Sequence, residues 1–385
     1  MSGRLEKYLE SWTRSGIIDN AIAERIRQFE AKEETAHGLR WPVLLAIAFG
    51  GLLLCAGVLL FVAAHWDTLS PGHRFGLVLA MVALFHVAGA ISTSRFPPLS
   101  TAFHAVGTIS LGAGIFLAGQ IFHLQEHWPG GVMLWAIGAV AAWGLLRDWT
   151  QAALVAILVP VWLGGEWVEA TQMHYGGDII LAEGLLLLAI TYLSAVMPDR
   201  ESSTRKALMW IGGVALIPLT VLTALSGTYH YRSWQPLSEA LQATGWIVAL
   251  AVPLALSWLL RKKAAWINGV AALWVIVLGT TSLERHGYSG SLFSRMWPEL
   301  GFYLVTAAGS VALVGWGLRE ARRERINLGI AGFALTILGF YFSSVMDKLG
   351  RSASLIGLGV LFLLGGWLLE KTRRRLVARL QRGDS

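Results

Sequence analysis

Long apolar stretches separated by short polar segments make up most of the chain from residue 42 onward. A helix needs about 20 mainly apolar residues to cross the hydrocarbon core of a bilayer, and these stretches approach that length. We therefore predict an all-α fold, a polytopic transmembrane helical bundle of about 12 spans. The predicted spans are residues 42–64, 75–93, 102–121, 131–146, 150–164, 178–197, 207–226, 241–260, 264–283, 298–318, 326–343 and 353–370.

The fourth and fifth spans, 131–146 and 150–164, are short and only three residues separate them. They cross separately, form a re-entrant pair, or merge into one helix. Merging would reverse every later span and would move the cluster Arg261, Lys262 and Lys263 to the other side of the membrane. The distribution of basic residues therefore favours two separate segments.

With the N-terminus placed inside, 25 of the 31 Lys and Arg residues fall on the inner side. Because basic residues concentrate in cytoplasmic loops, this predicts that both termini lie in the cytoplasm. The net charge of +7 then reflects topology and a surface that meets anionic membrane lipids, not nucleic-acid binding.

Composition excludes several classes of protein. Hydrophobic residues make up 55% of the chain and charged residues 14%, and the mean hydropathy is +0.57. A disordered chain, an ordinary cytosolic enzyme and a disulfide-rich secreted module all have different compositions. The single cysteine, Cys55, cannot form an internal disulfide.

Both ends of the chain are polar and divide it into three parts: 1–41, 42–370 and 371–385. In the first part, apolar residues at helical spacing, Gly16 at a helix end and Asp19 or Asn20 at a helix start predict a cytoplasmic helical hairpin. This hairpin either packs on the membrane base or binds a protein partner. The basic tail 371–385 is predicted to lie at the inner lipid surface.

Three segments carry a family resemblance: LEKYLESWTRSGIID near the N-terminus, GGLLLCAGVLLFVAAHWDTLSPGHRFG in the first hairpin, and GQIFHLQEHWPGGVMLWAIGAVAAWGLLRD. Over roughly residues 4–150 the chain resembles the bacterial predicted membrane-protein family known as domain of unknown function 2157. The resemblance implies a multi-pass inner-membrane protein and no particular activity. The family more often has Gly-Asp where this chain has Glu126-His127.

The string from His123 to His127 matches the H-x-x-E-H motif of inverted zinc proteases. That motif needs a continuing helix, whereas Trp128 and Pro129 follow at once. We interpret the string as coincidental and expect no metal site and no cofactor.

Polar residues near the outer ends of three spans are the candidate substrate-binding site. Glu183 is the carboxylate well inside a span, and a charged group in a membrane is costly unless it has a function or a partner. We predict that it converges with polar residues of the first hairpin and the third span on one outward-facing vestibule. The predicted lining is His65, Asp67, Arg74, Gln120, His123 and Glu183.

Three functions fit this pattern. The first is a transporter or lipid flippase with the outer vestibule, and the second is a non-catalytic scaffold or accessory subunit that binds a partner through residues 1–41. The third is a membrane-embedded enzyme, and the absence of phosphate-loop and nucleophile motifs makes catalysis the weakest of the three.

Overall fold

The computed structural model describes residues 9, 11–26, 49, 53, 69–121, 127–172, 174–197, 201–226, 233–287 and 292–345, together with 356, 359, 360, 363, 367 and 371. The chain divides into two compact units, Met1–Arg74 and Phe75–Ser385. The elements of the described part, most of them in the second unit, are α4 (Pro71–Ser92), α5 (Pro97–Ile121), α6 (Trp128–Leu146), α7 (Trp149–Thr171), β1 (His174–Tyr175), α8 (Gly177–Leu193), α9 (Ser203–Leu225), β2 (Ser233–Pro236), α10 (Glu239–Arg261), the 3-10 turn Lys262–Ala265, α11 (Trp266–Gly287), α12 (Leu292–Arg319), α13 (Arg323–Phe340) and the π-helical turn Tyr341–Val345.

The predicted helical membrane fold is confirmed in its coarse form. The ten helices from α4 to α13 correspond to the second to eleventh predicted spans, while the first and twelfth fall almost wholly outside the described residues. Within the described part, eight helical stretches are long and apolar enough to cross a membrane, one of which contains both α10 and α11. The total of about 12 spans stays a prediction.

Helices α6 and α7 are separate, as the charge distribution indicated. Arg147 ends α6 in the left-handed region at φ 54°, and the Asp148 side chain caps α7 by accepting from the Gln151 amide. Each helix is long and apolar enough to span a membrane. Helix α7 continues to Thr171, beyond the predicted end at 164, and α6 begins three residues before its predicted start.

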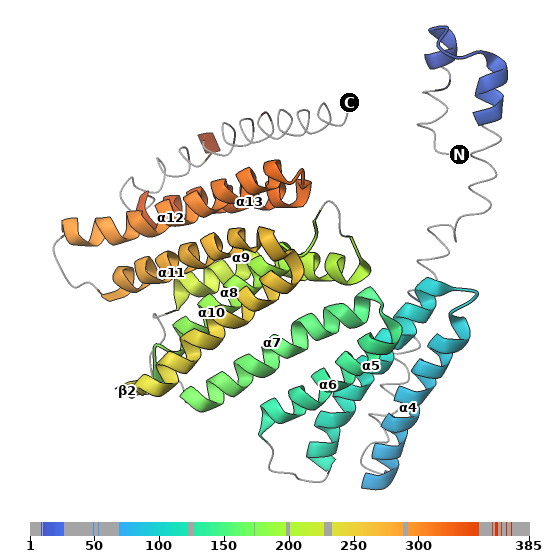
Figure 1. The fold of residues 1–385 in the computed structure, drawn as a ribbon, viewed down its shortest axis with the longest axis horizontal. Helices are drawn as coiled ribbons and strands as arrows, with labels where there is room; N and C mark the ends of the chain where they lie inside the picture. The colour runs from blue at the N-terminus through green and yellow to red at the C-terminus, as the bar shows by residue number, and fades with distance from the viewer. Residues whose placement is uncertain are drawn as a thin grey trace. The chain divides into compact units, whose positions relative to one another are not determined.

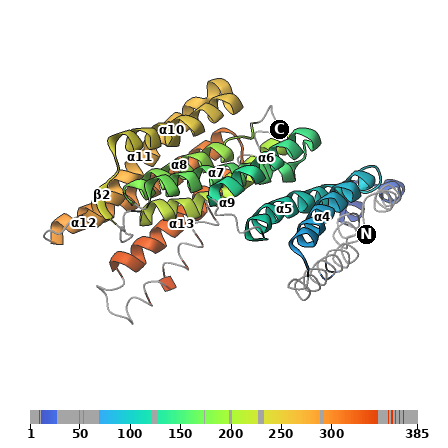
Figure 2. The same cartoon turned by 90° about the horizontal axis from the view of Figure 1, so that it is seen from below.

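Helix α8 lies at the centre of the second unit. It contacts α7, α9, α10 and α11, and twelve of its 17 residues are buried (Figures 1 and 2). Leu186, Leu187 and Leu193 form the main hydrophobic core with residues of α9, α11 and α12. A helix that is mainly apolar around its circumference is buried among neighbouring helices, as α8 is.

In the first unit, two features predicted for residues 1–41 are present locally. Gly16 has φ +71° after a helical stretch, and the Ile17 amide bonds back to the Trp12 carbonyl as in a helix C-cap. Asp19 accepts from the Ile22 amide at the start of the next helical stretch, as an N-cap does. A complete hairpin, and the boundaries of the three predicted parts, stay predictions.

Candidate functional site: an apolar groove and its acidic rim

A groove of ≈ 290 Å³ lies between α7, α8 and α10. Glu166 and Thr244 carry the only charged and hydroxyl groups among its lining residues; the others are apolar or aromatic. Small residues make the room: a Cβ at Gly184 would come within 2.9 Å of the Ala249 Cβ, and Gly164 and Gly245 also line the groove. The shape and lining suit a hydrocarbon chain.

The groove follows only half of each helix. Its lining on α10 runs from Leu241 to Pro253, about 18 Å at the helical rise. Pro160 of α7 and Pro253 of α10 lie at the opposite end from Ala170 and Leu241. A length of about 15 Å is half the hydrocarbon thickness of a bilayer, so the groove matches one leaflet.

Carboxylates and indoles gather near the C-terminal end of α7, where the groove begins. Glu166 bonds to His127 Nε2 at 2.7 Å and accepts from Trp162 Nε1 at 3.1 Å. Glu169 accepts from Trp128 Nε1 at 2.7 Å. We call Glu166 and Glu169 the acidic rim. It combines negative charge with aromatic rings that favour a membrane interface.

His127 therefore takes part in a contact that the H-x-x-E-H interpretation did not foresee. It is the N-cap residue of α6 in an extended conformation, and the helix starts directly after it. The extended backbone of His127 means that no helix continues from this residue into Trp128, as the sequence indicated, and a new helix starts there with proline in its first turn. His123 lies outside the described residues.

Glu183 is buried in α8 with 3% of its surface exposed, and it packs against α11. A Cβ at Gly279 of α11 would overlap the Glu183 carboxylate, so only glycine leaves room for it. Its Oε2 atom is buried without a hydrogen-bond partner among the described residues. Its neighbour Gly184 lines the groove, but the Glu183 side chain faces α11.

Of the other residues of the predicted vestibule, two are described locally and the rest lie outside the described part. Gln120 is exposed at the end of α5, and Arg74 Nε donates to the Leu69 carbonyl at 3.0 Å. His65 and Asp67, like His123, lie outside the described residues. The convergence of these residues with Glu183 on one vestibule stays a prediction.

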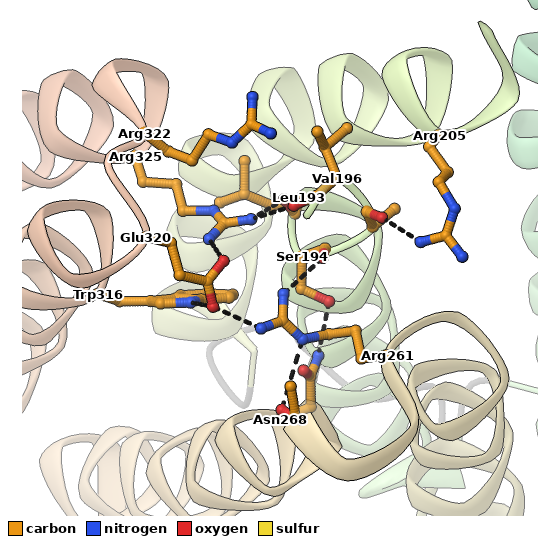
Figure 3. Close-up of polar contacts among 12 residues, drawn as sticks. Leu193, Ser194, Val196, Arg205, Arg261, Asn268, Trp316, Glu320, Arg322 and Arg325 are labelled. Atoms are coloured by element: carbon orange, nitrogen blue, oxygen red, sulfur yellow. Dashed lines mark hydrogen bonds and ion pairs between the residues drawn. The ribbon is translucent and has the colours of Figure 1, made fainter. Parts of the chain in front are cut away.

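A second polar group, the arginine cluster, surrounds the C-terminal end of α8 (Figure 3). We define it as Arg205, Arg261 and Arg325 with Glu320. Four consecutive backbone carbonyls at the C-terminal end of α8 and directly after it accept hydrogen bonds from these guanidinium groups. They belong to Leu193, Ser194, Ala195 and Val196. These carbonyls have no partner within their own helix, and cations stabilise that end of the helix dipole.

Glu320 holds the two most buried arginines of the cluster. The side chains of Arg261 and Arg325 are 0% and 1% exposed, and both pair with Glu320. Burial alone would raise the pKa of Glu320, but hydrogen bonds from Arg261, Arg325 and Trp316 outweigh it and hold the pKa at about 2. Asn268 completes the set by donating to Thr191 and Ser194. The hydrogen bonds of the cluster satisfy polar groups at the C-terminal end of α8. We therefore interpret the cluster as structural.

Sequence reasoning missed both the groove and its rim. The fifth span was predicted to end before Glu166, so this residue and Glu169 were assigned to a loop, although both lie on α7. The signal that could have found them is the i, i+4 pair of Trp162 and Glu166 on one helical face.

The described helices define a multi-pass helical membrane protein with several apolar helices. Residues 10–151 match the family model described as predicted membrane protein (DUF2157). This confirms the resemblance found in the sequence over that stretch, and the description assigns no activity. No curated protein and no solved structure matches the chain.

Proposed function

We propose that the protein is a transporter or flippase for a membrane amphiphile, which it binds in the groove between α7, α8 and α10. The observation that carries this proposal is an apolar groove one leaflet deep that begins at an acidic rim. The hydrocarbon chain occupies the groove and the headgroup lies at Glu166 and Glu169. Two carboxylates favour a headgroup with an amine, as in an ethanolamine lipid.

The proposal includes the predicted topology of a bacterial inner-membrane protein. With both termini in the cytoplasm, the turn after α7 lies outside and the groove opens to the outer leaflet. The basic residues around the arginine cluster then lie at the cytoplasmic surface, in agreement with the positive-inside rule. The outward-facing vestibule predicted from the sequence, with His65, Asp67, Arg74, Gln120, His123 and Glu183 as its lining, remains part of this proposal.

A topology measurement tests this orientation. Reporters fused after Asp384 and within residues 199–205 should read cytoplasmic, whereas a reporter in the turn at 172–176 should read periplasmic. The expectation follows from the 25 basic residues assigned to the inner side against 6 outside. A periplasmic C-terminus would require an odd number of spans and would overturn the orientation.

Filling the groove should block lipid movement. Val248 lines the groove and is 42% exposed, so a Val248→Trp side chain would occupy it, and we expect flipping of a labelled ethanolamine lipid in proteoliposomes to fall about tenfold. The matched control is Ile247→Trp, which is one residue away on α10, 65% exposed and absent from the groove lining. Equal flipping by both variants and the unsubstituted protein would contradict the proposal.

The alternative function is a membrane scaffold or accessory subunit. It is favoured by the arginine cluster, whose hydrogen bonds fix α8 to its neighbours and are typical of a rigid bundle. In that case residues 1–41 form the contact with a protein partner. A stable complex that is lost when residues 1–40 are deleted, without lipid flipping, would establish it.

A further inference from the structure

Helices α4 and α5 form an antiparallel pair in which the same short motif occurs on both helices. The motif is H-x-x-G: His86 and Gly89 on α4, and His104 and Gly107 on α5. Four contacts between the two helices follow each other away from the connecting turn. In this order they join Thr93 to Ser100, Gly89 to His104, His86 to Gly107, and Val78 to Gly114. The two motifs therefore lie opposite each other with local two-fold symmetry.

Each histidine packs on the glycine of the other helix. A Cβ at Gly89 would come within 2.8 Å of the His104 ring, and a Cβ at Gly107 would come within 2.8 Å of His86 Nε2. The two glycines thus allow the rings to enter the helix interface. There the two Nδ1 atoms lie 3.1 Å apart, within hydrogen-bond distance.

Few other charged residues of the described part lie on the helices around the histidine pair. His104 is 7% exposed and His86 is half-buried. Among the described residues, α4 contributes only His73 and Arg74, in its first turn, as further titratable groups, and α5 and α6 contribute none. Arg95 lies in the connecting turn, and Arg147 and Asp148 lie between α6 and α7, where the Asp148 side chain caps α7. Glu166 and Glu169 lie at the other end of α7. No described carboxylate therefore pairs with the two imidazoles.

We propose that His86 and His104 together form an intramembrane site that binds one proton. In the neutral pair, one Nδ1–H donates to the other Nδ1, and the donor ring keeps a free lone pair on Nε2. A proton taken up at that Nε2 makes the donor an imidazolium and turns the bond into a stronger, charge-assisted one. The pair thus keeps its geometry with one proton bound.

A second proton has the opposite effect. It can only add to the accepting Nδ1, after which both Nδ1 atoms carry hydrogen and the bond between them is lost. Two positive charges then face each other in the helix interface without a counter-ion. The two helices separate, so the pair responds to acid by opening the contact between α4 and α5.

Disulfide trapping in the full-length protein in nanodiscs measures this separation. With Cys55→Ser as background, we introduce Val78→Cys and Gly114→Cys, because the Gly114 Cβ would lie 3.8 Å from the Val78 Cβ, a typical disulfide spacing. The second proton meets the charge of the first, so it binds below the usual histidine range. Between about pH 8 and about pH 4, we expect cross-linking to fall about 3- to 10-fold more with both histidines present than with His104→Gln. Efficient cross-linking at about pH 8 shows in the same experiment that the variant is folded.

The matched control is His73→Gln, which removes an exposed histidine of the same helix and should leave the pH response unchanged. Three results would overturn the proposal. One is the same pH response in the His104→Gln variant, and another is a loss of the response in the His73→Gln control. The third is one bound zinc per chain that disappears with His86→Gln or His104→Gln, which would make the pair a metal site.

Discussion

Replacing Glu320 by glutamine should destabilise the protein by about 3–5 kcal/mol, the usual cost of leaving a buried charge without its partner. Glu320 is the carboxylate that pairs with both Arg261 and Arg325, whose side chains are fully buried. Glutamine keeps the shape and the size but removes the negative charge. Two guanidinium groups would then face each other at the end of α8 without neutralisation.

Chemical unfolding of the purified protein measures this loss. The control is Glu201→Gln, which removes a carboxylate that also pairs with two cations, Lys206 and Arg322, but is 40% exposed. Water screens an exposed ion pair, so this variant should remain close in stability to the unsubstituted protein. If the two variants lose the same stability, Glu320 does not act as the buried counter-ion.

The same pair of variants should differ in their response to acid. The folded-state pKa of Glu320 is about 2, below its value in an unfolded chain, so Glu320 stabilises the fold above about pH 4.3. That contribution is lost as the pH falls from about 4.3 towards 2. The Glu320→Gln variant lacks the contribution at every pH, so its stability should vary less over this interval.

Sequence reasoning succeeded where a signal is local. A run of apolar residues defines a lipid-compatible helix by itself, and ten predicted spans coincide with helices. The break between α6 and α7 was also predictable. Asp148 is a good N-cap residue, and the basic residues downstream stay on the inner side only if the two helices cross the membrane separately. The start of α6 was predicted three residues late, because the predicted span left out Pro129, which is a first-turn residue of the helix.

The arginine cluster shows where a local signal is insufficient. In the sequence, Arg261 and Arg325 contributed only to the count of basic residues on the inner side. In the structure they bond to carbonyls near residue 194, which is 67 residues away from Arg261 and over 120 from Arg325. A single sequence carries no signal that pairs residues so far apart. From the sequence alone, an arginine that bonds to a helix end cannot be distinguished from one that only lies on the cytoplasmic side.

Glu183 and the groove illustrate a second limit. A carboxylate inside an apolar span was a correct sign of an unusual position, and Glu183 is indeed buried. The glycine that admits it is on α11, and which helices pack together depends on small side chains at matching heights. The groove likewise depends on small residues of different helices, Gly164, Gly184 and Gly245. Their spacing in the sequence does not indicate that they lie close together in space.

Gly212→Ala should be severely destabilising, while Gly213→Ala should not. A Cβ at Gly212 would overlap the Ala189 carbonyl oxygen and the Leu193 amide nitrogen, which are backbone atoms of α8 and cannot rotate away. A Cβ at Gly213 has its nearest neighbour at 3.4 Å, the end of the flexible Leu328 side chain. Forcing a methyl group into a closed contact costs about 1–3 kcal/mol or more.

The comparison isolates packing, because both glycines lie inside α9 and both substitutions gain the same helix propensity of about 1 kcal/mol. Gly213→Ala should therefore be neutral or slightly stabilising in chemical unfolding. Gly212→Ala should move α8 away from α9 near Leu193. The Leu193 carbonyl accepts a hydrogen bond from Arg325, so this bond of the arginine cluster should be lost together with the helix contact. Equal stability of the two variants would mean that α8 and α9 do not approach as closely as Gly212 allows.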